Sequence, residues 1–437
     1  MPHLSPATSP EPLVRSVDLA QYTEGLARYR AGGWDDEQWT AFRVRFGIYG
    51  QKQPGVQMVR IKIPGGVVPV AWLRTIAEAN RRFAEGKAHV TTRQDVQIYY
   101  VATDRTADLM AFLNENGVTT REACGNTIRN LTSCALSGVC PREHVDAGKV
   151  ASDLARLWLR HPLTQHMPRK FKIAVSGCET DCGATGLHDM GLVATERDGL
   201  KGFRVVAAGG LGGTPRPAVV VADFATAAEI PAILEALLRL HQRYSDRRNR
   251  NASRIKFLVN RFGEDKFLTL FAEELERVKG LPGRPFAEPS WRAPSAAPEP
   301  GTPGGVVAQH DGLSAIVIDL PLGCISSDEM DALAGIAERA GVAELRATRE
   351  QSLVVAGVQP AEAARVVAEI RALGLKVADA EGGLPDVISC PGTTTCRIGI
   401  TSSYNFAAEV LAQAETDPRA KLVNVRVSGC QNSCGLH

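Results

Sequence analysis

Residues 175–183 read VSGCETDCG, and residues 427–435 read VSGCQNSCG. Each stretch is preceded by another cysteine pair, in NLTSCALSGVC (residues 130–140) and in VISCPGTTTCRIG (residues 387–399). The first pair stands 44 residues before the second in one copy (134 to 178) and 40 in the other (390 to 430). Chance agreement in both motif and spacing is implausible, so the chain contains an internal duplication.

The segments before the cysteines repeat as well. In the first copy, alternating apolar residues predict strands over 56–66 and 89–101, and amphipathic stretches predict helices over 72–86 and 104–118. The second copy repeats this order, with strands over 314–323 and 344–358 and helices over 326–341 and 360–375. Aligning TTRQDVQIYYV with ATREQSLVVAGV sets Arg93 opposite Arg349. Each copy therefore opens with a β-α-β-α unit.

Composition narrows the class of protein. The 437 residues carry a net charge of only +2 and no apolar run long enough for a membrane span, so we expect no nucleic-acid or membrane partner. The N-terminus lacks the apolar core of a secretory signal, which predicts a cytoplasmic protein with reduced thiols. We expect a disordered lead over residues 1–37 and a proline-rich linker over 282–305.

The two copies differ at their ends. After Cys182 the first copy continues for about a hundred residues, whereas only three residues follow Cys434. We therefore expect the second copy to be truncated at its C-terminus and the chain to be a fragment.

The cysteine pattern of the second copy points to a metal centre. A C-x5-C pair followed by a C-x3-C pair brings four soft thiolates from two loops together, as an iron–sulfur cluster requires. Zinc is an alternative, although its usual knuckles have shorter spacing than the x5 pair. Unliganded thiols are a further one. Small residues around the cysteines, such as Gly392 and Gly429, allow backbone N–H groups to approach the sulfurs.

CPGTTTC and SGCQNSC together resemble the signature of the sirohaem-dependent nitrite and sulfite reductases. The resemblance covers about residues 38–437 and includes the two-copy plan. It implies that Cys390, Cys396, Cys430 and Cys434 bind a [4Fe–4S] cluster, and that Cys434 is also the axial ligand of the sirohaem iron. It further implies the six-electron reduction of a small oxyanion, either sulfite to sulfide or nitrite to ammonia.

Cations at matching positions complete the implied site. They are Arg93 in TTRQ at a strand, Arg129 in GNTIRN, and Lys170 and Lys172 in RKFK, two apart and hence on one face of a strand. Arginine offers forked hydrogen bonds to an oxyanion, and lysine also donates protons. The resemblance implies that these four surround the substrate, and Lys172 in RKFK favours sulfite over nitrite.

A glycine-rich turn, GGLGG, occupies residues 209–213, and the basic segment RRNRNASRIKFLV lies further along the chain at residues 247–259. A dinucleotide-binding loop is one interpretation of the turn, although its spacing is not G-x-G-x-x-G. Backbone groups here and Arg247, Arg248, Arg250 and Arg254 are candidates for meeting the sirohaem carboxylates. A solvated basic face is an equal alternative.

We therefore predict an α+β protein with duplicated ferredoxin-like half-domains and duplicated mixed α/β domains that bind sirohaem and cluster, related by a pseudo-two-fold. The predicted domains are half-domains over 38–118 and 306–376, a first sirohaem/cluster-type domain over 119–281 and an incomplete cluster-binding domain over 377–437. We recognise no motif that would bind NADPH as a source of electrons. We therefore expect ferredoxin or a flavoprotein subunit as the electron donor. Alternatives are an electron-transfer module without sirohaem and a cobalamin-pathway synthase of the same fold.

The first-copy thiols pose a separate question. Cys134, Cys140, Cys178 and Cys182 repeat the cluster spacing and are candidates for a second cluster. Cys134, however, is followed by Ala135-Leu136 where Cys390 is followed by Pro391-Gly392, so its loop lacks the freedom that glycine supplies. We favour buried thiols inherited from the duplication over a second cluster.

Overall fold

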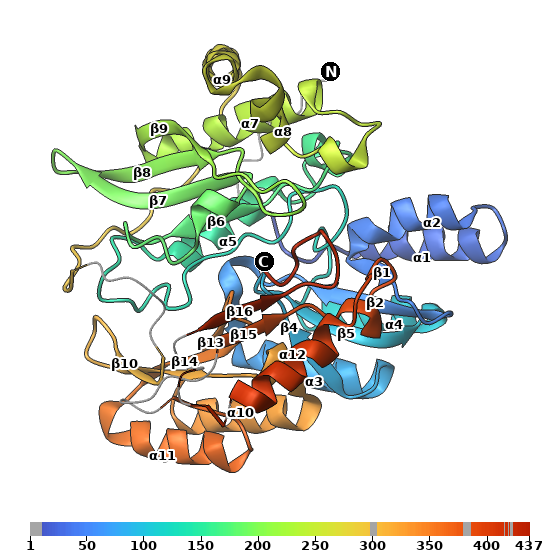
Figure 1. Cartoon of the computed structure of the whole chain (residues 1–437), viewed down its shortest axis with the longest axis vertical. Coiled ribbons are helices and arrows are strands. Elements are labelled where there is room, and N and C mark those ends of the chain that lie inside the picture. Colours follow the sequence, from blue (N-terminus) through green and yellow to red (C-terminus); the bar gives the residue numbers. More distant parts are fainter. Residues whose placement is uncertain (1–10, 298–303, 379–385, 415, 418, 420–422) are drawn as a thin grey trace. The chain divides into compact units, whose positions relative to one another are not determined.

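The computed structural model describes residues 11–297, 304–378, 386–414, 416–417, 419 and 423–437 (Figure 1). These residues form two compact units. Unit 1 comprises residues 11–13, 125–138 and 142–297, and unit 2 comprises residues 14–124, 139–141 and the described residues from 304 onward.

Unit 2 contains both half-domains and the second cysteine segment. Its helices are α1 (Ser16–Arg30), α2 (Asp36–Arg43), α3 (Val70–Phe83), α4 (Thr106–Glu115), α10 (Ser327–Arg339), α11 (Pro360–Ala372) and α12 (Ser403–Ala414). Its strands are β1 (Ile48–Gly50), β2 (Val56–Ile61), β3 (Val67–Pro69), β4 (Lys87–Val90), β5 (Val96–Ala102), β10 (Val306–Ala308), β11 (Ser314–Ile318), β12 (Cys324–Ser326), β13 (Glu344–Ala347), β14 (Leu353–Val358), β15 (Asp386–Ser389) and β16 (Asn424–Val427).

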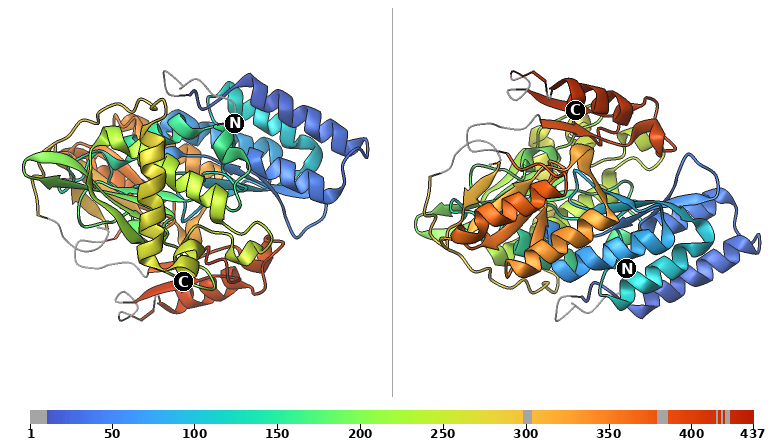
Figure 2. Two further views of the ribbon diagram at one scale, coloured as in Figure 1. Left: turned by 90° about the horizontal axis from the view of Figure 1, so that it is seen from above. Right: turned by 90° about the horizontal axis from the view of Figure 1, so that it is seen from below.

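The two half-domains exchange strands. One sheet has the order β1-β2-β5-β4-β12 and the other β10-β11-β14-β13-β3, so each half supplies the edge strand of its partner's sheet. Helices α3 and α10 pack against each other, and the helices of both halves lie side by side when viewed from below (Figure 2). One continuous apolar core, which includes Ile61, Ile98, Ile316 and Leu345, spans the two halves. The predicted duplication of ferredoxin-like half-domains is confirmed, and the halves form one folding unit.

Two predicted strands are wrong. The single strands expected over 89–101 and 344–358 are hairpins, because the chain reverses at residues 91–95 and 348–352. In both turns a glutamine takes the left-handed backbone conformation, Gln94 with φ of 56° and Gln351 with φ of 61°. An alternating pattern runs through both arms of a hairpin, so it did not disclose the turn.

The hairpins also correct the alignment of the two copies. Thr91 donates its N–H to Asp95 O at 2.9 Å, and Thr348 donates to Ser352 O at 3.0 Å. With these turns superposed, Arg93 corresponds to Glu350 rather than to Arg349. The second copy therefore has no cation at the position of Arg93.

The N-terminal lead is also more ordered than expected. Residues 1–10 lie outside the described residues, but α1 is a helix where we expected disorder, and α2 begins at Asp36 within the same predicted segment. Tyr22 of α1 is fully buried and shares a 2.8 Å hydrogen bond with Thr106. Trp39 of α2 packs beside it, with ring centroids 5.7 Å apart. Aromatic burial therefore anchors this segment to the first half-domain.

Unit 1 is built on the sheet β6-β7-β8-β9. Its strands are β6 (Ile173–Ser176), β7 (Met190–Arg197), β8 (Leu200–Ala207) and β9 (Val219–Ala225); its helices are α5 (Ala147–Trp158), α6 (Pro162–Gln165), α7 (Ile230–Tyr244), α8 (Lys256–Phe262) and α9 (Glu264–Lys279). Residues 282–297 of the predicted linker belong to this unit, where Arg292 forms a 2.8 Å ion pair with Glu143. None of the helices in the described residues combines the length and apolarity needed to cross a membrane.

Candidate cluster and anion sites

The second cysteine segment begins with two short parallel strands. Ser389 of β15 pairs with Val427 of β16, so both strands end at the same edge. Cys390 follows Ser389 directly and donates its N–H to Val427 O at 3.3 Å. Since parallel strands deliver their following loops to one edge, the loops carrying Cys390 and Cys430 meet there.

The four thiols of this segment influence one another. Burial raises the pKa of the Cys396 thiol, and Cys434, Cys430 and Cys390 raise it further. Cys390 is buried, Cys396 and Cys430 are half-buried, and Cys434 is exposed. The structure thus brings together the four cysteines that the sequence singled out.

Hydrogen-bond donors surround these sulfurs. The N–H of Gly429 donates to Cys390 Sγ at 3.2 Å, and Asn432 Nδ2 donates to Cys430 Sγ at 3.4 Å. A Cβ on Gly435 would lie 2.0 Å from Val427 O, so only glycine fits there. Four thiols with N–H donors and close backbone approach match the needs of an iron–sulfur cluster.

The first half-domain holds two of the ligand loops. Lys52 donates its N–H to Thr395 O at 2.9 Å, next to Cys396. Thr92 Oγ1 donates to Cys434 O, also at 2.9 Å.

Across the described residues, no group of three or more His, Cys, Asp or Glu side chains is close enough to hold a single metal ion.

Three of the four predicted cations come together in unit 1. Arg129 donates its N–H to Phe171 O at 2.9 Å, and Phe171 donates to Thr127 O at 3.1 Å. These bonds align the segment of Arg129 in parallel with that of Lys170 and Lys172. Phe171 is fully buried between the two half-buried lysines, as expected for an extended segment whose lysines share one face.

A buried ion pair between Asp189 and Arg254 holds the backbone of Lys172. Asp189 is fully buried and accepts the Lys172 N–H at 2.8 Å. Its carboxylate also accepts two bonds from Arg254, at 2.8 and 3.1 Å. This guanidinium donates in turn to Gly209 O at 3.3 Å. Arg254, a candidate for sirohaem carboxylates, therefore joins the lysine segment to the glycine-rich turn.

The glycine-rich turn connects β8 and β9, which are antiparallel neighbours. A dinucleotide-binding loop connects a strand to a helix, so the dinucleotide interpretation is wrong. Buried Lys256 donates through Nζ to Leu211 O at 2.9 Å and also to the carbonyls of Gly210 and Thr214. Lys256 of the basic segment thus stabilises the glycine-rich turn by hydrogen bonds to its carbonyl oxygens.

Arg93, the fourth predicted cation, lies in unit 2 with the cluster cysteines. It is 7% exposed and stands in a hairpin turn rather than in a strand. Burial raises the pKa of neighbouring Asp95 to about 6, against the lowering effect of Arg60, Lys62 and Arg93. Lys62, one of these cations, is 1% exposed.

The first-copy loop retains one hydrogen bond of the second. Gly177 donates its N–H to Cys134 Sγ at 3.4 Å, as Gly429 does to Cys390. Burial raises the pKa of Cys134, with further contributions from Cys182 and Cys178. These three thiols belong to unit 1, whereas Cys140 belongs to unit 2.

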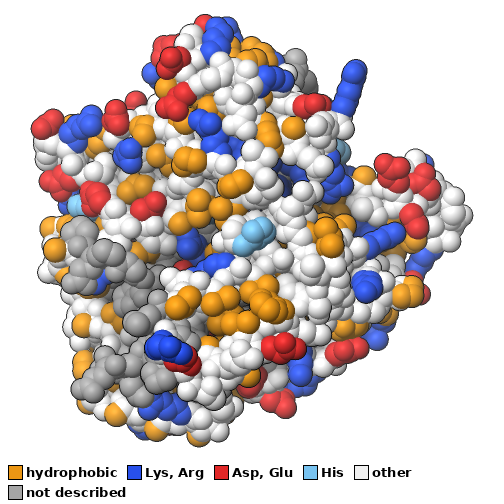
Figure 3. All heavy atoms as spheres, in the orientation of Figure 1, with side chains coloured by type: hydrophobic (Ala, Val, Ile, Leu, Met, Phe, Trp, Pro, Cys, Tyr) orange, Lys and Arg blue, Asp and Glu red, His pale blue; other side chains and the backbone are white. Residues whose placement is uncertain are grey.

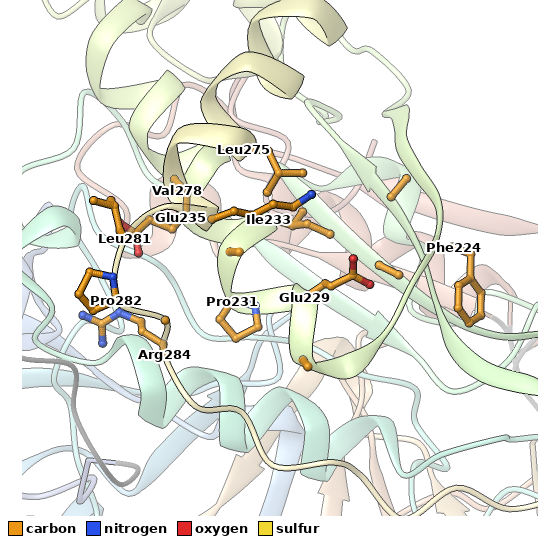
Figure 4. Close-up of a pocket in the computed structure, with 16 residues that line it drawn as sticks. Phe224, Glu229, Pro231, Ile233, Glu235, Leu275, Val278, Leu281, Pro282 and Arg284 are labelled. Atoms are coloured by element: carbon orange, nitrogen blue, oxygen red, sulfur yellow. The ribbon is translucent and has the colours of Figure 1, made fainter.

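Two surface features lie apart from these groups. A pocket of about 290 Å³ on unit 1, lined by Phe224, Ile233, Leu275 and Arg284 among others, contains none of the predicted site residues (Figure 4). In unit 2, apolar side chains gather on the C-terminal segment (Figure 3), where Ile398 and Ile400 are 62% and 75% exposed. The C-terminal segment therefore presents an apolar surface beside Cys396.

Comparison with known proteins identifies both kinds of domain. The model of the nitrite and sulphite reductase 4Fe-4S domain matches residues 124–279, and that of the nitrite/sulfite reductase ferredoxin-like half domain matches residues 49–116 and 307–373. The two half-domain matches lie within the half-domains predicted from the sequence.

Individual relatives align over nearly the whole chain. A sulfite reductase (ferredoxin) of Mycobacterium tuberculosis is 26% identical, over 99% of this chain and 81% of the relative. An assimilatory ferredoxin-dependent nitrite reductase of Haloferax mediterranei is 27% identical, over 92% of this chain and 72% of the relative. The structure of M. tuberculosis NirA shares the fold, with a TM-score of 0.80 at 24% identity over 97% of this chain and 82% of that one. With family models matching both half-domains and the first cysteine domain, the chain belongs to the nitrite and sulfite reductases, oxidoreductases that bind sirohaem and a [4Fe–4S] cluster.

Proposed function

We propose that this protein reduces sulfite to sulfide by six electrons, at a sirohaem bridged through Cys434 to a [4Fe–4S] cluster on Cys390, Cys396, Cys430 and Cys434. The observation that carries the proposal is that β15 and β16 end at one edge, where the loops of Cys390 and Cys430 meet and the Gly429 N–H donates to Cys390 Sγ. When bound, the cluster and the sirohaem supply the electrons and the iron that the oxyanion needs.

The backbone of the cluster loops has a defined task. The N–H of Gly429 and the amide of Asn432 point at sulfur, so they stabilise thiolate charge that burial would otherwise disfavour. Gly435 allows the chain to turn tightly beside Val427. These residues hold the sulfurs in place before the cofactor binds.

The cations Arg93, Arg129, Lys170 and Lys172 are the proposed anion-binding and proton-donating groups. A guanidinium offers paired N–H donors to the oxygens of a compact anion, and an ammonium group holds a proton that it can release. Asp189 fixes the backbone of Lys172, so its ammonium group starts from a defined position. Of these cations, Arg129, Lys170 and Lys172 belong to unit 1, and Arg93 belongs to unit 2, which also carries the proposed cluster ligands in residues 377–437.

The proposed substrate and electron donor rest on the RKFK motif and on the names of the relatives. Lys172 in RKFK favours sulfite, whereas the similarity to a named nitrite reductase makes nitrite the second candidate. Relatives named as ferredoxin-dependent favour a ferredoxin as donor over a flavoprotein subunit.

Anaerobic purification tests the proposal. We expect iron, acid-labile sulfide and sirohaem in the protein, and sulfide formation with reduced ferredoxin. Stoichiometric zinc without labile sulfide would contradict the cluster assignment. A cluster without sirohaem absorption would indicate an electron-transfer module, and a cluster protein inert toward both anions would favour the cobalamin-pathway alternative.

A further inference from the structure

Gln351 is a buried side chain that joins three parts of unit 2. It belongs to the hairpin turn between β13 and β14, and it is 2% exposed. Its Oε1 accepts the N–H of Ser389 at 3.0 Å. Its Nε2 donates to Val90 O at 3.3 Å and contacts His89 Nε2 at 2.9 Å. One amide therefore links the second half-domain, the first half-domain and strand β15, which ends at Ser389 just before Cys390.

The backbone of Gln351 adopts a conformation that is unfavourable for glutamine. Its φ of 61° lies in the left-handed region, which glycine and asparagine adopt more readily than glutamine. Thr348 would close the turn without any long side chain, since its Oγ1 accepts the Ser352 N–H at 3.1 Å and its N–H bonds Ser352 O. The turn thus closes without the glutamine side chain, whose length instead serves its bonds to Val90 O and to the Ser389 N–H.

The partner of Gln351 stands next to a cluster ligand. Ser389 is fully buried and directly precedes Cys390. Beyond Ser389, Cys390 Sγ receives the Gly429 N–H, and Ser403 Oγ lies 3.4 Å from the same sulfur. A change in the Ser389 backbone moves the sulfur relative to both groups. Residues behind metal ligands commonly set ligand orientation in this way.

We infer that Gln351 is a positioning residue for Cys390, which fixes this ligand against the half-domain framework and thereby sets the retention and reduction potential of the cluster. The inference rests on the proposed function, because it takes Cys390 as a cluster ligand. Gln351 makes no contact with sulfur itself among the interactions described, so its effect passes through Ser389.

Gln351→Asn is the decisive variant. Asparagine suits the left-handed conformation, so the turn keeps or gains stability, but the shorter side chain cannot hold Ser389. Changes behind metal ligands typically weaken metal binding about 10–100-fold, so we expect iron release to a chelator to be about tenfold faster. We also expect a shifted midpoint potential in the purified holoprotein, with unchanged far-UV circular dichroism.

Two further variants separate positioning from folding. Gln351→Glu retains the length and the acceptor for Ser389 but loses the donor to Val90 O, so we expect iron release to be slower than from Gln351→Asn. Thr348→Val removes the hydroxyl that accepts Ser352 N–H, so it weakens the same turn without touching Ser389. We expect a lower thermal midpoint for Thr348→Val with wild-type iron release.

The outcomes are distinct. If Gln351→Asn retains wild-type iron release and potential, or if Thr348→Val loses iron as fast as Gln351→Asn, the positioning role is refuted. Wild-type protein that assembles no cluster refutes the proposed function and the role of Gln351 with it. A wild-type cluster that is insensitive to Gln351 refutes only the latter.

Discussion

The backbone N–H of Gly429 points at Cys390 Sγ from 3.2 Å, so the loop carrying one cysteine pair holds the sulfur of the other. The bond depends on the parallel pairing of β15 with β16, which brings the ends of both strands to one edge. It stabilises a thiolate and raises the reduction potential of any cluster bound there, because it withdraws charge from sulfur.

The role of Cys434 can be tested by Cys434→Ser. Serine removes the thiolate that we assign as the bridge, so we expect loss of magnetic coupling between cluster and sirohaem, measured by electron paramagnetic resonance. Cys324→Ser is a matched control, since Cys324 is half-buried in the same unit and lies outside the ligand set. Retained coupling in Cys434→Ser would refute the bridge.

Substrate preference is tested by Lys172→Asn. The variant removes a cation and proton donor, so we expect sulfite turnover to fall more than nitrite turnover, about tenfold or more in the ratio of the two. Steady-state rates with a chemical electron donor measure this, and Lys201→Asn, at a half-buried lysine of β8, controls for loss of charge. An equal loss on both anions would show that Lys172 does not discriminate.

Breaking the buried pair of Asp189 and Arg254 should destabilise unit 1. Asp189→Asn leaves the guanidinium buried without a counter-charge, which typically costs about 3–5 kcal/mol. Chemical denaturation measures this change. The double variant Asp189→Asn, Arg254→Met removes both charges and should be less destabilised than the single one. If it is destabilised more, the penalty does not come from the unpaired charge.

His241 should make unit 1 sensitive to acid. Its imidazole is fully buried between Ser245 and Arg169 O, and burial lowers its pKa from 6.5 to about 4. Below pH 6.5 the unfolded chain binds a proton that the folded protein refuses until about pH 4. Up to about 3 kcal/mol of stability is therefore lost as pH falls through this range. His241→Gln should flatten the slope of stability against pH between 6.5 and 4, and an unchanged slope would assign it to other groups.

We expect one cluster in each chain. Gly177 and Cys134 repeat the bond between Gly429 and Cys390, but the Ala135-Leu136 loop lacks the glycine that follows Cys390. The double variant Cys134→Ser, Cys178→Ser should therefore retain all non-haem iron, whereas Cys390→Ser, Cys430→Ser should lose it. About eight rather than four non-haem irons per sirohaem in wild type would show a second cluster.

The sequence by itself determined the duplication, the α+β half-domains and the grouping of Cys390, Cys396, Cys430 and Cys434. These features are local: the spacing of cysteines and the period of apolar residues survive in a linear pattern. Family membership followed from the same motifs. The predicted roles of Arg93, Arg129, Lys170 and Lys172 are still proposals, although three of these residues do lie on adjacent segments of unit 1.

Only the tertiary structure decided the rest. The exchange of β3 and β12 between half-domains depends on pairing between strands that are far apart in sequence. The hairpin turns at Gln94 and Gln351 were hidden because an alternating pattern continues through both arms. Asp189 and Gln351 are ordinary polar residues in the sequence, and Arg254 is one of four candidate arginines with nothing to set it apart. All three support the proposed sites because they are buried and hydrogen-bonded to distant segments of the chain. Neither their burial nor these partners can be read from the residues next to them in the sequence.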